Sequence, residues 1–383
     1  MLLVAACGST SATGSNSTSS GSGSASSASG SSSGGGSTSS ANLSAVRSQL
    51  AAYSHLPTFK APGPAFNARK VMAGKTIFSI PVNSADQFVQ ILEQGNAAIA
   101  HQLGFKYVDY TNSGSLSSWV QGMQTAVNEK ANAIDLLSGI NPAQLGPQMA
   151  AAKSAHIPVI ASDAYDLNEP AAPGLSAVMD VPYAEAGRLM AAYAISATSG
   201  KANVLVIGSN DVVSSPYMVN AINGEFSKYC PTCKVKDINI PVADWATQTQ
   251  TQVEADLNAD PGINYILPVY DSQSQFVVPA ITAAGRTGKV FIATYDGTPF
   301  VLKMMQDGNT VKMDVGEDLN WISYAVMDQD MRVAAGMKPS PNENTPMMIF
   351  TKSNVNTAGV PPRNSTGYGS SYIAGYKKLW GLG

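Results

Sequence analysis

The sequence Ala133-Ile-Asp-Leu-Leu137 is a short apolar run, and Ile157-Pro-Val-Ile-Ala-Ser-Asp163 contains a second one. Residues 145–155, between them, are expected to form a helix. Apolar runs of this length, bounded by polar residues, are typical of buried strands. Two strands joined by a helix pair side by side through a right-handed crossover. This stretch therefore predicts a strand–helix–strand unit of a parallel sheet.

The same alternation of apolar runs and helical patterns continues on both sides of this unit. Strands are expected at residues 75–81, 107–110, 133–137, 157–161, 202–208, 235–240, 265–269 and 289–293. Helices are expected at residues 88–103, 116–128, 145–155, 183–196, 217–229, 247–258 and 275–284. Alternation of this kind predicts an α/β fold, with two doubly wound parallel-sheet lobes. In such sheets ligands bind at the carboxyl ends of the strands.

Composition narrows the classes of function. The chain has 383 residues, a net charge of -3 and only 13% charged residues. A basic stripe for nucleic acid is missing, so nucleic acid is excluded as a partner. The sequence contains no hydrolase elbow, zinc-protease motif or phosphate-binding loop, and its three histidines are scattered. We therefore expect no catalytic chemistry, no cofactor and no metal site.

The N-terminal sequence Val4-Ala-Ala-Cys7 is followed by a tract of Ser, Gly, Ala and Thr. The four residues resemble the lipobox of bacterial lipoproteins, in which the cysteine receives lipid. The tract is typical of a flexible linker. We expect residues 1–7 to be a truncated signal, Cys7 to be lipidated and residues 8–69 to be a tether. The protein is then extracytoplasmic and anchored to the cell membrane.

Two further cysteines, Cys230 and Cys233, are separated by two residues. A zinc site needs two more ligands, and no histidine is close in sequence. A thioredoxin-like site needs the first cysteine to open a helix after a strand, whereas this pair follows an expected helix. A small structural disulfide is the favoured interpretation, with a redox site as the alternative.

Hydrogen-bonding and aromatic side chains gather near the ends of the expected strands and beside the helices that follow. Carboxylates and amides bind paired hydroxyl groups, and flat rings contact the C–H face of a polyol. Any single Asp also fits a structural role as a helix N-cap; the argument rests on recurrence in both lobes. The candidate ligand-binding residues are Asn83, Ser84, Phe88, Asp163, Tyr165, Tyr217, Trp245, Tyr270, Asp271, Asp296, Glu317 and Asp318.

Three stretches in this order resemble the type I periplasmic sugar-binding proteins of ABC transporters, the ribose/galactose group. They are residues 132–163, residues 260–285 and Phe291-Ile-Ala-Thr-Tyr-Asp-Gly-Thr-Pro299. The resemblance implies three crossovers near Met179, Gly316 and Pro346. It assigns residues 74–179 plus 317–346 to one lobe and residues 180–316 plus 347–383 to the other.

The resemblance also implies roles for the chain. It implies a monomer that closes on a small ligand, a carbohydrate or polyol, and then docks on an ABC permease. Asp163, Trp245 and Asp296 match ligand-binding positions of the family, Tyr270 stands where Asn is common, and Glu317 or Asp318 falls where a hinge Gln is usual.

Two departures from the family pattern concern arginines. Ala164 stands where the family has Arg, and a second Arg is missing around Met218–Ile222. Loss of both guanidinium groups removes bidentate donors to hydroxyls. A non-sugar ligand (aromatic, nucleoside or amine) therefore stays open. A ligand-sensing lipoprotein that signals to a receptor is a second alternative, because the sequence does not separate import from sensing.

Overall fold

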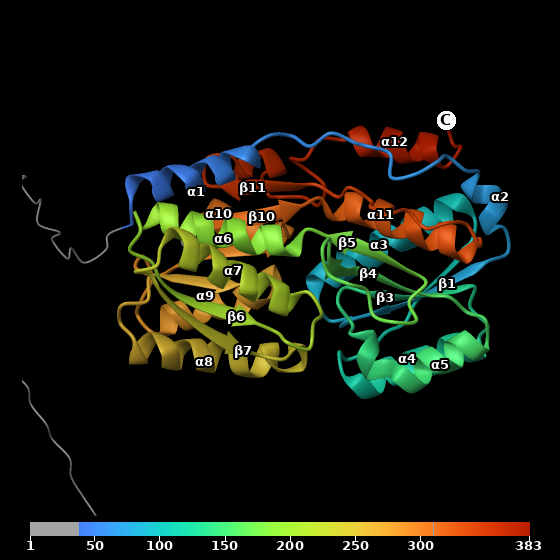
Figure 1. Cartoon of the computed structure of the whole chain (residues 1–383), viewed down its shortest axis with the longest axis horizontal. Coiled ribbons are helices and arrows are strands. Elements are labelled where there is room, and N and C mark those ends of the chain that lie inside the picture. Colours follow the sequence, from blue (N-terminus) through green and yellow to red (C-terminus); the bar gives the residue numbers. More distant parts are fainter. Residues whose placement is uncertain (1–37, 309) are drawn as a thin grey trace, which may run out of the picture. The chain divides into compact units, whose positions relative to one another are not determined.

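The computed structural model describes residues 38–308 and 310–383 (Figure 1). Cys7 and residues 8–37 of the expected tether lie outside this range. The first sheet has five strands in the order β2-β1-β3-β4-β5, and all neighbouring pairs are parallel. Its strands are β1 (Thr76–Pro81), β2 (Lys106–Asp109), β3 (Ala133–Leu137), β4 (Val159–Asp166) and β5 (Ala177–Val181).

The second sheet has six strands in the order β11-β10-β9-β8-β6-β7. Only the edge pair formed by β10 and β11 is antiparallel. The strands are β6 (Asn203–Gly208), β7 (Lys234–Asn239), β8 (Tyr265–Pro268), β9 (Phe291–Asp296), β10 (Val311–Glu317) and β11 (Met347–Thr351). The two sheets confirm the expected α/β fold with two parallel-sheet lobes.

Helices connect and cover these strands. They are α1 (Ser40–Ala52), α2 (Ala68–Met72), α3 (Gln87–Leu103), α4 (Leu116–Asn128), α5 (Gly146–Ser154), α6 (Tyr183–Ala197), α7 (Ser215–Tyr229), α8 (Trp245–Ala259), α9 (Asp271–Ala283), α10 (Pro299–Asp307), α11 (Leu319–Ala334) and α12 (Ser371–Leu379). Helix α3 shows how sequence sets these bounds. Asp86 caps its first turn, Phe88, Leu92 and Ile99 face the core, and Gly104 ends it with φ 84°. Glycine adopts this left-handed conformation without a Cβ clash.

The chain passes between the two sheets three times within the described residues. It crosses from β5 to α6, from β10 to α11, and from α11 back to β11. Helix α11 packs against α3 and the first sheet, and its residues 321–334 are all buried. A helix buried on every side is typical of a core element.

The segment 40–69 corrects the expected tether. Helix α1 packs on α6 and α7, with Val46 fully buried, and the Asn42 side-chain amide donates to the Tyr229 carbonyl over 3.1 Å. Further on, Phe59 lies in edge contact with Tyr376, at 5.0 Å between ring centroids. Ser and Ala dominate α1, so its helical pattern is hidden in a tract of the same composition.

Helix α12 corrects the lobe expected for the C-terminal segment, because it packs on α11 rather than on the second sheet. Tyr372 stacks on Trp321 at 4.7 Å, and Trp380 stacks on Tyr324 at 5.2 Å. The Trp380 indole N–H also donates to Asp328 over 2.6 Å. Aromatic stacking with a buried hydrogen bond thus fixes the chain end to the helix that covers the first sheet.

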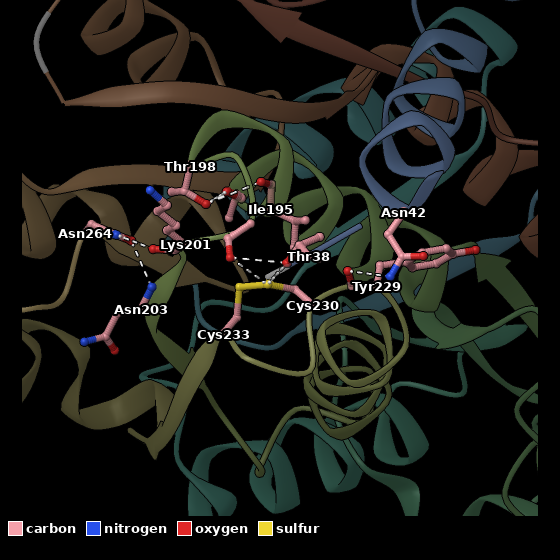
Figure 2. Close-up of a disulfide and its surroundings, with 12 residues drawn as sticks. Thr38, Asn42, Ile195, Thr198, Lys201, Asn203, Tyr229, Cys230, Cys233 and Asn264 are labelled. Carbon is pink, nitrogen blue, oxygen red and sulfur yellow. Dashed lines mark hydrogen bonds between the residues drawn. A yellow bond between two sulfur atoms is a disulfide. The ribbon is translucent and has the colours of Figure 1, made fainter. Parts of the chain in front are cut away.

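Cys230 and Cys233 form a disulfide in the turn between α7 and β7 (Figure 2). The Thr38 hydroxyl donates to the Gly200 carbonyl over 3.3 Å and lies 3.0 Å from the Cys230 sulfur. The disulfide therefore lies where the chain enters α1. Among the described residues, none of the helices combines the length and apolar character needed to cross a bilayer.

The core of the first lobe holds a cluster of acidic groups without a cation. The Ser79 and Tyr107 hydroxyls each donate to Glu93 over 2.6 Å. Asp135 and Asp330 are fully buried, and their carboxylate oxygens have no partner in the described part of the chain. Burial raises the pKa of Glu93 to about 8 and that of Asp135 to about 7. Below about pH 7 the folded protein therefore favours the neutral form of Glu93 and Asp135.

This cluster predicts that the free energy of unfolding falls as pH rises. An acid whose pKa is raised by folding stabilises the fold below its unfolded pKa, and that contribution disappears as pH passes the folded value. The loss is expected between about pH 5 and 8, measured by urea unfolding. Glu93→Gln should flatten this slope, whereas Glu129→Gln, at an exposed side chain, should not. An equal slope in wild type and Glu93→Gln would contradict the assignment.

Two ion pairs with the same helical spacing differ in burial. Arg332 and Asp328 are almost fully buried, with Nε and Oδ2 2.7 Å apart, and Arg332 also donates to the Pro64 carbonyl. Lys303 and Asp307 form an exposed pair. We expect Arg332→Ala to lower the unfolding free energy by about 3–5 kcal/mol, because it leaves a buried charge unpaired. Lys303→Ala should cost less than about 1 kcal/mol. Equal costs in denaturant unfolding would refute this role of the buried pair.

Candidate functional site

A small cavity of about 30 Å³ lies between the lobes, at the carboxyl ends of strands from both sheets. This volume holds roughly two water molecules, at about 10–15 Å³ each on the same measure. A larger ligand does not fit this volume without a change in the lining. The lining residues are Val82, Asp86, Phe88, Val89, Ser138, Asp163, Tyr183, Val212, Ser214, Trp245, Tyr270, Ser272 and Asp296.

The lobes contact each other at the edges of this cavity. The Ser272 hydroxyl, in the first turn of α9, donates to Asp86 Oδ1 over 2.6 Å. The Val213 N–H donates to the Gly139 carbonyl over 3.0 Å, and Ile140 and Val212 form an antiparallel bridge. These contacts form only when the two lobes touch, so their presence marks the closed arrangement of the lobes.

Asp163 is the carboxylate that the first sheet contributes, from the irregular second half of β4. The register of β4 against β5 shifts between Ser162 and Asp166, and Asp163 has φ 52°. A bulge of this kind redirects a side chain at a strand end. The Tyr183 hydroxyl donates to Oδ1 over 2.8 Å and the Ser138 hydroxyl donates to Oδ2 over 3.1 Å. Burial raises the pKa of Asp163 to about 7 in spite of both donors.

Asp296 is the corresponding carboxylate of the second sheet, at the end of β9. Its Oδ2 accepts the Asp271 N–H over 2.9 Å, and Asp271 in turn accepts the Thr298 hydroxyl over 2.6 Å. Burial, followed by the charge of Asp271, raises the pKa of Asp296 well above its usual range. Asp296 has φ 133°, and strain of this kind in a non-glycine residue gathers at functional sites.

Gly297, next in the chain, explains how the turn after β9 fits. A Cβ at this position would lie 2.4 Å from the Tyr368 hydroxyl and 2.7 Å from the Gly316 Cα. Its φ of 75° also favours glycine. The glycine lets β9 and β10 approach closely and so fixes Asp296 at the cavity.

Aromatic rings form the apolar wall. Trp245 lies 6.0 Å from Tyr270, between ring centroids, and its indole N–H donates to the Ser209 hydroxyl over 2.8 Å. The Tyr270 and Ser214 hydroxyls are hydrogen-bonded over 2.8 Å. Phe88, from α3, lines the cavity with them. Rings fixed by their own polar groups present defined faces to a ligand.

Of the twelve candidate residues from the sequence, five line the cavity. They are Phe88, Asp163, Trp245, Tyr270 and Asp296. Asp163 lies in the last half of β4, Asp296 ends β9, and the other three lie at or near the start of the helix that follows a strand, so the strand-end pattern located them. Their role in binding a ligand stays a prediction.

The other seven candidates do not line the cavity. Several are occupied in local structure: Asn83 and Ser84 accept backbone N–H groups, Asp271 supports Thr298, and Asp318 caps α11. The Tyr165 hydroxyl accepts the Ala172 N–H. Tyr217 is exposed, and Glu317 is buried with both oxygens unpartnered among the described residues.

The sequence argument missed several residues of the lining. Ser138 follows the expected strand 133–137, and Ser272 follows Asp271, so the strand-end rule extended by one residue would have found both. Tyr183 begins the helix after the first crossover and had no sequence signal. Asp86 belongs to the side chains that follow the expected strand 75–81, although it is not among the twelve candidates. The other missed residues are Val82, Val89, Val212 and Ser214.

Comparison with known proteins gives the family. Residues 77–338 match the family described as "Periplasmic binding protein domain", and the chain belongs to this family. A comparison with curated protein sequences gives no match.

Solved structures show the same fold. One is an ABC transporter solute-binding protein from Agrobacterium vitis with bound allitol, at TM-score 0.66 and 22% identity, covering 74% of this chain and 98% of that one. A carbohydrate transporter protein from Acidothermus cellulolyticus with myo-inositol has TM-score 0.63 and 22% identity, covering 75% and 97%. A sugar ABC transporter protein from Yersinia enterocolitica has TM-score 0.70 and 18% identity, covering 85% and 98%.

The hydrogen bond between Ser272 and Asp86 predicts how closure responds to mutation. Ser272→Ala should weaken ligand binding about tenfold, because a hydrogen bond to a charged group contributes roughly 1.5–3 kcal/mol. Ser274→Ala, two residues on in the same helix and buried without a partner for its hydroxyl, is the control and should leave affinity unchanged. Calorimetric titration measures both. Equal affinities of wild type and Ser272→Ala would show that this hydrogen bond does not stabilise the closed form.

Proposed function

We propose that this protein is the extracytoplasmic solute-binding receptor of an ABC importer, and that its ligand is polyhydroxylated, a sugar or polyol. One observation supports this most directly: carboxylates from both sheets and a wall of aromatic rings surround one cavity between two lobes. Carboxylate oxygens accept hydrogen bonds from hydroxyl groups, and the rings contact C–H faces. The bound allitol and myo-inositol of the similar structures agree with this ligand class.

Capture takes place by closure and involves no change to the ligand. With the lobes apart, Asp163 on one side and Asp296 on the other become accessible. A ligand that bridges them has more contacts in the closed form, so it shifts the population toward closure by its difference in affinity. The permease then distinguishes the closed form from the open one.

We further propose that Cys7 carries the lipid anchor and that residues 8–37 form the tether. The lipobox-like Val4-Ala-Ala-Cys7 supports this, together with the position of α1. Since α1 packs on the second lobe, the proposed tether is shorter than residues 8–69. We propose that the protein binds its permease as a monomer.

A ligand panel tests the function. Thermal unfolding of the full chain is measured with hexoses, pentoses, alditols and inositols, and with nucleosides and amino acids for comparison. A ligand at a hundredfold excess over Kd stabilises by about 2.7 kcal/mol, which raises the melting temperature by several degrees. A shift with nucleosides or amino acids, and none with any sugar or polyol, would refute the proposed ligand class.

Variants of the cavity test the site. Asp163→Asn and Trp245→Ala should each weaken binding of the panel's best ligand at least tenfold, since both side chains line the cavity. Tyr217→Ala removes an exposed aromatic ring outside the lining and should bind normally. Circular dichroism confirms that each variant is folded. Full binding by both cavity variants would place the site elsewhere.

A further inference from the structure

The cavity has an unbalanced charge. Asp86, Asp163 and Asp296 line it, and no lysine or arginine of the described residues does. Glu317 adds a fourth carboxyl group near Asp163, and the two groups raise each other's cost of ionisation. The five ion pairs of the described part of the chain all lie outside the lining. A neutral ligand leaves these carboxyl groups without a counter-charge.

Acceptor atoms in the cavity are also left open. Asp296 is 3% exposed, and its Oδ1 has no hydrogen-bond partner in the described residues. Asp86 uses Oδ1 for the Phe88 N–H and the Ser272 hydroxyl, whereas its Oδ2 makes no hydrogen bond there. Asp163, in contrast, is satisfied by two hydroxyl donors. The lining thus provides free carboxylate oxygens from both lobes.

A cation is the partner that this arrangement lacks. Buried carboxylates without a counter-charge are costly, and they either take up protons or pair with a cation. The rings of Phe88, Trp245 and Tyr270 suit the same partner, because aromatic faces attract ammonium groups. Sugar phosphates and sugar acids are disfavoured, since closure would bury their charge against like charges.

We propose that the ligand is a polyhydroxylated amine, an amino sugar or amino polyol, whose ammonium group binds between Asp296 and the first-lobe carboxylates Asp86 and Asp163. This inference rests on the proposed function, because it specifies the ligand of the same cavity. The hydroxyl groups of the ligand donate to the remaining acceptors, and its C–H face contacts the aromatic wall.

Matched pairs of ligands test this charge requirement. The full chain is titrated by calorimetry at pH 7 with glucamine and sorbitol, which differ only in an amine replacing a hydroxyl. A second series compares glucosamine with glucose and with N-acetylglucosamine, in which the charge is removed. We expect the amine of each series to bind at least tenfold more tightly than its neutral counterparts.

Two variants connect the preference to the cavity. Asp296→Asn and Asp86→Asn keep the side-chain shape and remove one charge each, and both should reduce the ratio of amine to neutral affinity about tenfold. Asp330→Asn removes a buried carboxyl group from the core of the first lobe, and the ratio should stay unchanged. If Asp296→Asn fails to fold, the half-buried Asp86 carries the test.

The outcomes separate this inference from the function on which it rests. Tighter binding of neutral sugars or polyols than of their amines overturns the inference and leaves the sugar receptor standing. An amine preference that survives both cavity variants also overturns it. If no member of either series binds, the inference falls together with the proposed sugar and polyol ligands.

Discussion

Carboxyl groups buried at the carboxyl ends of both sheets, in a cavity that no lysine or arginine of the described residues lines, are the constraint on which this site depends. Each sheet brings one aspartate to the cavity in a backbone conformation that favours glycine, Asp163 with φ 52° and Asp296 with φ 133°. Neighbouring donors hold each of them: hydroxyls for Asp163, and a backbone N–H for Asp296. These donors orient the carboxyl groups but leave their charge unbalanced.

The rest of the molecule holds these groups in place. Helix α11 follows the crossover at Asp318 and is buried between the first sheet and the C-terminal helix α12. Within α11, Arg332 pairs with Asp328 and donates to the Pro64 carbonyl. The Trp380 indole N–H donates to Asp328, so residues 64 and 380 are both joined to this helix. A firmly packed helix at a crossover confines relative movement of the lobes to the connecting residues. The contacts at the cavity can then determine whether the lobes close.

The sequence predicted those features that depend on local pattern. Apolar runs and helical spacing located both sheets, and residues 116–128 and 133–137 coincide with α4 and β3. Strand-end reasoning found Asp163 and Asp296. It failed where tertiary contact decides: Tyr183 reaches Asp163 only after the first crossover, and Ser272 meets Asp86 only across the lobes. The packing of helix α1 against α6 and α7 was not predicted, because a Ser/Ala composition gives no sign of this burial.

The charge arrangement also links ligand recognition to closure. Asp86 and Asp163 belong to the first lobe and Asp296 to the second, so ionised carboxylates repel across the cleft as the lobes approach. Two events remove this repulsion: protonation, which the raised pKa of Asp163 favours, or a cation placed between the lobes. A cation turns the same charges into attraction toward a common centre, and the gain grows as closure excludes water. If the ligand is the proposed amine, the carboxylates of the cavity thus oppose closure without the ligand and favour closure with it, which is the difference in affinity that a receptor needs.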